Sequence, residues 1–165
     1  MKLSFSTNGW NLPIDRLIDL CAENRIDALE IHDVNASAFS DEDVFGKSNL
    51  SALKKRLYEK GIKISCFDAV GNVADIENAE NNRKEIENLI DVCAALGSKF
   101  IRVRATGEYS DELVDKMQAF IEPVIVKAKS AGVTILLESM GMFADTGRLA
   151  SFLNRFASDS FGALW

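Results

Sequence analysis

The chain has 165 residues, of which 47% are hydrophobic and 27% are charged, and its formal net charge at pH 7 is -6. This length and composition predict one globular domain, residues 1–165, with a buried core. The acidic balance disfavours binding to nucleic acid or to an anionic membrane, so we expect a small molecule as the partner. No apolar run approaches the ~18 residues of a membrane span, and the chain opens with strand-like alternation instead of a signal peptide, which predicts a cytoplasmic location.

Short β-rich apolar runs recur along the chain at intervals of 26 to 38 residues. Such an interval is the length of one βα unit, a strand followed by a helix. The runs begin near Lys2, Ala28, Ile62, Phe100, Val133 and Phe161.

Amphipathic helical patterns separate these runs, with apolar residues at i, i+3, i+4 and i+7. Three of the patterns end at glycines, namely Gly61, Gly97 and Gly132, and the last begins after Asp145. Pro123 lies inside the fourth pattern, where we expect it to kink the helix or split it in two. The polar run 75–85 is predicted to be a solvated loop followed by a first helical turn.

Strict alternation of strands and helices predicts a parallel sheet covered by helices. Two architectures satisfy it. One is an open, doubly wound sheet, in which a phosphate-binding loop would be expected, but the chain contains neither G-x-G-x-x-G nor G-x-x-x-x-G-K-[ST]. The other is a (β/α)₈ barrel, which typically needs about 250 residues.

The cysteines are an odd number at wide spacing, with no Cys-x-x-Cys pair. This pattern indicates neither a disulfide framework nor a zinc-thiolate site. Cys21, Cys66 and Cys93 all fall in apolar patterns, so we predict that they are core thiols.

Glu138 directly follows the apolar run 133–137, and this is the position where the carboxyl end of a parallel strand presents a side chain to an active site. The alternative is an ordinary acid that caps the next helix or pairs with a lysine.

Two further pairs of polar residues lie two positions apart, so each pair shares one face of its strand. Glu30 and His32 form the first pair; His32 is a candidate proton shuttle or, equally, a structural histidine bonded to Glu30. Arg102 and Arg104 form the second. An arginine fork suits a phosphate or carboxylate on a substrate, and we expect Arg104 at the rim, while one arginine pairs with an acid such as Glu138.

Several stretches of the sequence are similar to the xylose-isomerase-like barrels, the sugar phosphate isomerase/epimerase family. The most specific are the helix end at residues 94–97 leading into Ile101-Arg-Val103, and the strand Gly132-Val-Thr-Ile-Leu-Leu-Glu138. The other stretches are residues 3–7, 26–32, 53–64, 90–93, 128–131 and 145–149. The resemblance extends over essentially the whole chain.

The resemblance implies an α/β fold of the TIM-barrel type, incomplete here, with about five βα units and the start of strand six. It implies isomerisation or epimerisation of a sugar or sugar phosphate by proton transfer next to a carbonyl, assisted by divalent Mn, Mg, Zn or Co. Glu138 matches the metal ligand at the end of strand five and is, with His32, a predicted catalytic residue. The other ligands of the family would follow Trp165, so we expect this chain alone to bind no metal tightly and to show little activity.

The resemblance also implies substrate-binding positions at the strand ends. We expect Asn8 and Trp10 after the first strand and Asp68 after the third to orient sugar hydroxyls or stack on a sugar face, together with Glu30 and Arg104. Turn chemistry explains Asn8-Gly9 without any substrate.

Two functions of other classes stay open. One is a non-catalytic binding or assembly module on the same scaffold; the other is a phosphodiesterase like the abasic-site endonucleases, which the acidic balance disfavours. An incomplete barrel has two unpaired strand edges, so we also expect self-association through them.

Overall fold

The computed structural model of the protein describes residues 2–34 and 43–165, and its strands and helices alternate as the sequence predicts. The elements are β1 (Ser4–Ser6), α1 (Ile14–Glu23), β2 (Ala28–Val34), α2 (Leu50–Lys60), β3 (Lys63–Asn72), α3 (Ala79–Leu96), β4 (Phe100–Arg104), α4 (Asp111–Ala131), β5 (Thr134–Glu138), the 3-10 turn η1 (Gly141–Phe143), α5 (Thr146–Leu153) and β6 (Phe161–Leu164). The start of a sixth strand at Phe161 is confirmed.

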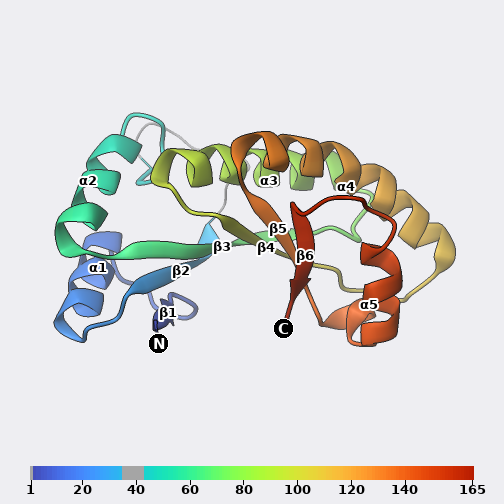
Figure 1. The fold of residues 1–165 in the computed structure, drawn as a ribbon, viewed down its shortest axis with the longest axis horizontal. Coiled ribbons are helices and arrows are strands. Elements are labelled where there is room, and N and C mark those ends of the chain that lie inside the picture. Colours follow the sequence, from blue (N-terminus) through green and yellow to red (C-terminus); the bar gives the residue numbers. More distant parts are fainter. Residues whose placement is uncertain (1, 35–42) are drawn as a thin grey trace.

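The strands of the described chain form one parallel sheet in which each strand pairs with the next, from β1 at one edge to β6 at the other. A doubly wound sheet reverses its strand order where the chain crosses to the other half. The sheet has no such reversal, so the fold is an incomplete TIM-type barrel and the doubly wound alternative is wrong. Figure 1 shows the helices arranged in an arc around this sheet.

The two faces of the sheet differ in burial, as β4 and β5 illustrate. Side chains on the outer face are buried beneath α3 and α4, and they are Ile101, Val103, Ile135 and Leu137. Side chains on the inner face, which include Arg102, Arg104 and Glu138, are only partly buried. The inner face therefore offers polar groups a route to water, and the candidate site lies there.

The helix ends follow the sequence prediction, because Gly61, Gly97 and Gly132 are the C-terminal caps of α2, α3 and α4. The expected split at Pro123 is wrong: α4 runs without interruption from Asp111 to Ala131. Pro123 lies on the exposed face of α4, where the carbonyl group that loses its helical hydrogen bond can bond to water instead.

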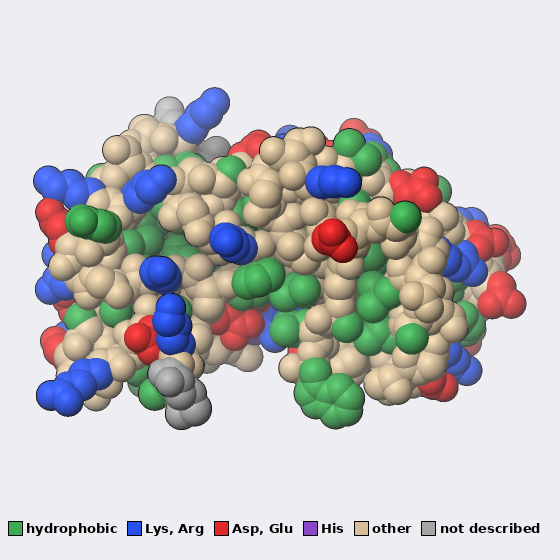
Figure 2. Space-filling view, viewed as in Figure 1, with side chains coloured by type: hydrophobic (Ala, Val, Ile, Leu, Met, Phe, Trp, Pro, Cys, Tyr) green, Lys and Arg blue, Asp and Glu red, His purple; other side chains and the backbone are tan. Residues whose placement is uncertain are grey.

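The surface shows a hollow away from the carboxyl ends of the strands. This pocket of about 510 Å³ lies at the opposite ends of β1 to β4 and is lined by Lys2, Leu3, Lys63, Lys99 and Phe100 among others. Figure 2 shows one face of the molecule, with hydrophobic side chains gathered at its centre.

None of the helices in the described ranges is both long and apolar enough to cross a membrane.

Candidate active site

Six charged or titratable side chains from four strands meet on the inner face of the sheet, toward the carboxyl ends of the strands. We call them the charged cluster: Glu30 and His32 from β2, Asp68 from β3, Arg102 and Arg104 from β4, and Glu138 from β5. The strand register brings them together, because Asp68 pairs directly with Arg102 across β3 and β4.

Asp68 is the centre of the cluster, with a side chain that is 0% exposed. Its carboxylate accepts hydrogen bonds from Arg102 Nε at 2.9 Å and Arg104 Nη2 at 2.5 Å, and it lies 3.0 Å from His32 Nδ1. The prediction that Asp68 follows the third strand is wrong, because β3 continues to Asn72. Both carboxylate oxygens are engaged within the protein.

Glu85 explains why β3 extends so far. Its carboxylate accepts hydrogen bonds from the backbone N–H groups of Val70 at 2.6 Å and Gly71 at 2.9 Å, which fixes the end of the strand against α3. Burial raises the pKa of Glu85 above its ordinary value, although the two N–H donors act in the opposite direction. Glu85 belongs to the run 75–85 predicted to be solvated, and that prediction is wrong for this residue, which is buried.

His32 has both ring nitrogens engaged, and the partners identify its tautomer. An arginine only donates hydrogen bonds, so Nε2 accepts from Arg102 Nη2 at 2.5 Å, while Nδ1 carries the proton that faces Asp68 Oδ2 at 3.0 Å. Glu30 Oε1 is 3.7 Å from Nε2, too far for a hydrogen bond. The expected His32–Glu30 couple is therefore secondary to the contacts of His32 with Asp68 and Arg102.

Arg102 connects the buried acid to the two acids nearer the surface. Its Nη1 lies 3.5 Å from Glu30 Oε1 and also 3.5 Å from Glu138 Oε1, and its side chain is 14% exposed. The hydrogen bond to Asp68 raises the pKa of Arg102 above its ordinary value. The prediction that one arginine pairs with Glu138 is confirmed for Arg102, whereas Arg104, with 32% of its side chain exposed, lies closer to the rim.

Glu138 ends β5 and keeps 27% of its side chain exposed on the inner face. It does not cap the next helix, because Asp145 does so by accepting hydrogen bonds from the N–H groups of Gly147 and Arg148. The turn after Glu138 packs tightly on the end of β4, since a side chain at Gly141 would collide with the carbonyl oxygen of Ala105. The position of Glu138 is thus fixed by the chain on both sides of it.

The residues present do not fit a divalent metal by themselves. Within the described ranges there is no group of three or more His, Cys, Asp or Glu side chains that could hold a metal ion. Glu30 and Glu138 both face the Arg102 guanidinium, and the oxygens of Asp68 are taken by donors. A metal needs oxygen or nitrogen ligands that are free to coordinate it.

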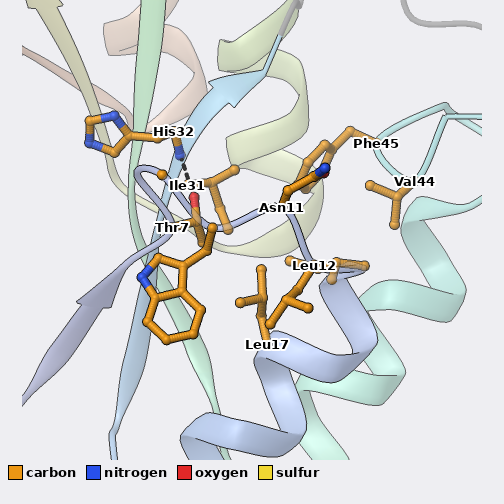
Figure 3. A pocket seen from close by; sticks show the side chains of 11 residues that line it. Thr7, Asn11, Leu12, Leu17, Ile31, His32, Val44 and Phe45 are labelled. Carbon is orange, nitrogen blue, oxygen red and sulfur yellow. Dashed lines mark hydrogen bonds between the residues drawn. The ribbon is translucent and has the colours of Figure 1, made fainter.

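A pocket of about 500 Å³ lies beside the cluster at the carboxyl ends of β1 and β2 (Figure 3). Its lining residues are Thr7, Gly9, Trp10, Asn11, Leu12, Ile14, Leu17, Ile31, His32, Val44 and Phe45. The backbone N–H of His32 donates to Thr7 Oγ1 at 2.8 Å, so Thr7 in the pocket lining is hydrogen-bonded to β2.

Two of the predicted substrate-binding residues lie at or next to this pocket. Trp10 is half-exposed and its ring meets Phe5 edge to face, with 5.1 Å between the centroids. Asn8 lies in the preceding turn, where its backbone N–H donates to Ser6 Oγ at 3.4 Å. Asn11 also lines the pocket but was not among the substrate-binding residues predicted from the sequence. Its position in the same polar loop as Asn8 is the one feature of the sequence that could have indicated this role.

Comparisons with known proteins bear on the family. The sequence profile described as "Xylose isomerase-like TIM barrel" matches residues 18–165. No curated protein matches the sequence at a significant level.

Three similar solved structures cover almost all of this chain. They are a xylose isomerase-like TIM barrel protein from Mycobacterium smegmatis in complex with magnesium (TM-score 0.76, 16% identity, 98% of this chain and 63% of that chain), 3-keto-D-glucoside 4-epimerase from E. coli (0.76, 19%, 99% and 67%), and D-psicose 3-epimerase in the presence of D-fructose (0.77, 13%, 99% and 62%). The chain thus spans about two thirds or less of their length. At these identities the likeness establishes a shared fold.

The family profile covers nearly the whole chain, and the sheet follows the sequential strand order of a barrel. The chain belongs to the Xylose isomerase-like TIM barrel family.

Proposed function

We propose that this chain forms part of a sugar or sugar phosphate isomerase or epimerase, which moves a proton at a carbon next to a carbonyl group. The single observation that carries the proposal is the meeting of Glu138, His32 and Arg102 at the carboxyl ends of neighbouring barrel strands. Active sites of TIM barrels lie at that edge. Two of the similar structures, at low identity, are named as sugar epimerases, which supports the same reaction class.

Glu138 is the proposed catalytic carboxylate. Its side chain is partly exposed on the inner face, and Arg102 holds it in place, so a substrate carbon can approach it from the open side. A positioned carboxylate is a suitable acceptor for a proton beside a carbonyl. His32 stays a predicted catalytic residue; proton transfer at its Nε2 requires the hydrogen bond from Arg102 to break first.

The substrate is proposed to occupy the pocket beside β1 and β2. Trp10 offers a half-exposed ring for stacking on a sugar face, and Asn8 lies next to it. Arg104 is the more exposed guanidinium of the cluster, so it is the proposed partner of a substrate phosphate. Glu30 and Asp68 stay predicted substrate-binding residues, and the burial of Asp68 favours an indirect role through the arginines.

A divalent metal would supply polarisation of the substrate carbonyl, as one similar protein binds magnesium. Glu138 is the ligand that we propose this chain contributes. The remaining ligands would have to be residues other than those described, because the described residues do not form a metal site.

The test is hydrogen exchange at the carbon next to the carbonyl, measured with the complete reading frame that encodes these residues. The protein is incubated in D₂O with Mg²⁺ or Mn²⁺ and a panel of ketoses and ketose phosphates, and deuterium incorporation is followed by NMR. We expect exchange that Glu138→Gln lowers by about 10²-fold or more, the range for loss of a general base. The matched control is Glu112→Gln on the exposed start of α4, which should leave exchange unchanged. Exchange that is absent from every sugar, or equal in Glu138→Gln, contradicts the proposal.

A further inference from the structure

We propose that Glu85 is a positioning residue for Arg104, because it holds the bulged end of β3 against which the Arg104 guanidinium lies. The proposal rests on the proposed function in one respect, the choice of Arg104 as the partner of a substrate phosphate. It adds a buried residue of α3, outside the charged cluster, that sets how tightly the site holds an anion.

A bulge in β3 is the first argument. Asp68 pairs in register with Arg102. The next register pair is Asn72 with Arg104, so β3 advances four residues where β4 advances two. Residues 69–71 therefore have no register partner in β4 within the described chain. A bulge leaves backbone groups out of the ladder, and beside active sites bulges change the direction in which a side chain points.

Glu85 binds this bulge from α3, and that is the second argument. Its side chain is 5% exposed, and its carboxylate oxygens accept hydrogen bonds from the N–H groups of Val70 at 2.6 Å and Gly71 at 2.9 Å. A Cβ atom at Gly71 would lie 2.8 Å from Glu85 Oε2 and 2.6 Å from Asn82 Oδ1, so the packing fits glycine alone. Asn82 Nδ2 adds a bond of 2.9 Å to the carbonyl oxygen of Asn72. The bulge is thus held by two side chains of one helix.

Arg104 spans the bulge, which is the third argument. Its backbone carbonyl accepts from the N–H of Val73 at 3.0 Å, beyond the bulge. Its Nη2 donates to Asp68 Oδ2 at 2.5 Å and to the carbonyl oxygen of Ala69 at 3.5 Å, where the bulge begins. Arg104 Nε is buried and has no hydrogen-bond partner among the described residues. A flattened β3 would carry the two ends of the bulge apart, and Arg104 could not keep both sets of contacts.

The consequence concerns an anion at the rim, where 32% of the Arg104 side chain is exposed. A guanidinium held in one orientation binds an anion with a smaller loss of side-chain entropy than a mobile guanidinium does. Releasing the bulge should therefore weaken anion binding at Arg104, although Glu85 is itself buried beneath β3.

The experiment titrates inorganic phosphate into the ¹⁵N-labelled 165-residue chain and follows the Arg104 Nε–Hε signal by NMR, with Arg104→Gln to identify that signal. Glu85→Gln keeps the shape of the side chain but replaces one acceptor oxygen by a donor. The matched control is Glu80→Gln, on the exposed face of the same helix. Asn82→Ser is a second variant, which loses the bond to Asn72 and leaves Glu85 in place, so that a Glu85→Gln chain that does not fold still leaves a test. Circular dichroism checks the fold of each variant.

We expect the unaltered chain and Glu80→Gln to give the same Arg104 signal and the same phosphate affinity. Glu85→Gln and Asn82→Ser should move the signal before any phosphate is added and should bind phosphate about three- to tenfold more weakly, the range for loss of one well-placed hydrogen bond. A Glu85 with a merely structural role would lower Tm and leave both readouts of the folded variants unchanged, and that result overturns the proposal. A chain that binds no phosphate at Arg104 overturns it as well. No sugar is present, so failure here and failure of the sugar exchange test are distinguishable.

Discussion

Replacing Asp68 with asparagine tests whether the charged cluster holds the inner face of the sheet together. Asp68 is 0% exposed and faces three donors, from Arg102, Arg104 and His32. Asparagine has nearly the same shape, so the substitution removes the negative charge and leaves no cavity. The Arg102 guanidinium then keeps its positive charge in a mostly buried position without its main partner.

The magnitude follows from the burial of each partner. Removing one member of a buried ion pair costs roughly 3–5 kcal/mol, and we take the lower end because the asparagine oxygen still accepts one hydrogen bond. Arg104 is one third exposed, so water replaces much of its lost interaction and adds at most about 1 kcal/mol. A loss of ~3 kcal/mol in a chain of this size lowers Tm by roughly 6–12 °C.

The assay is urea and thermal unfolding followed by circular dichroism, with Asp91→Asn as the matched control. Asp91 is exposed on α3 and makes one ion pair, with Lys127 at 3.0 Å, so its replacement should cost less than about 1 kcal/mol. In a double-mutant cycle, Asp68→Asn and Arg102→Gln should together cost less than the sum of the single effects. An Asp68→Asn loss below about 1 kcal/mol, or full additivity with Arg102→Gln, would refute the reasoning.

Further predictions concern the strand ends, the thiols and the sheet edges. Gly141→Ala should destabilise the chain in thermal melts by more than Gly9→Ala. Both glycines have positive φ, which costs alanine roughly 1–2 kcal/mol, but only at Gly141 would the added Cβ atom also collide with a backbone oxygen. Equal losses of stability would contradict this prediction. Burial raises the pKa of the Cys66 and Cys93 thiols to about 12, so at pH 8 they should react with a disulfide reagent only after unfolding in urea. Burial also raises the pKa of Glu85, so the native state keeps the proton of this carboxyl group to higher pH than the unfolded state does. The protonated Glu85 therefore contributes its full stabilisation below the ordinary pKa of 4.5, and this contribution declines as the pH rises above that value. Glu85→Gln should remove this decline from the free energy of unfolding measured by urea titration at several pH values. The edges of β1 and β6 should drive concentration-dependent self-association in sedimentation velocity, which a strictly monomeric, cooperatively unfolding chain would rule out.

The fold follows from local patterns in the sequence, which is why it was predictable. The apolar run 133–137 forms most of β5, with Glu138 at its end, because a short β-branched run bounded by glycines is typical of a buried strand. Gly132 ends α4 in the left-handed conformation, as a residue without a side chain readily does. The sequence predicted that Pro123 kinks or splits its helix, and the split does not occur, because the effect of a proline depends on which face of the helix it occupies and that is decided by packing.

The contacts within the charged cluster depend on the register between neighbouring strands, which the sequence pattern does not predict. The two-residue spacing of Arg102 and Arg104 correctly indicates one shared face. It does not indicate that Arg102 is opposite Asp68 across the strand pair, and this pairing decides which arginine is buried and which reaches the rim. Glu85 was missed for a similar reason, because its charged neighbours in the sequence are solvated while its own side chain turns under β3.

The charge balance of the cluster bears on the substrate. Three carboxylates, from Glu30, Asp68 and Glu138, face the two guanidinium groups of Arg102 and Arg104, so acids outnumber arginines in the cluster. Arg102 already faces three acids of the protein, Asp68, Glu30 and Glu138. Arg104 contacts only Asp68 within the cluster and is the more exposed of the two. Under the proposed function, we therefore propose that a substrate phosphate binds on the Arg104 side and that the reacting carbon of the sugar lies on the side of Glu138.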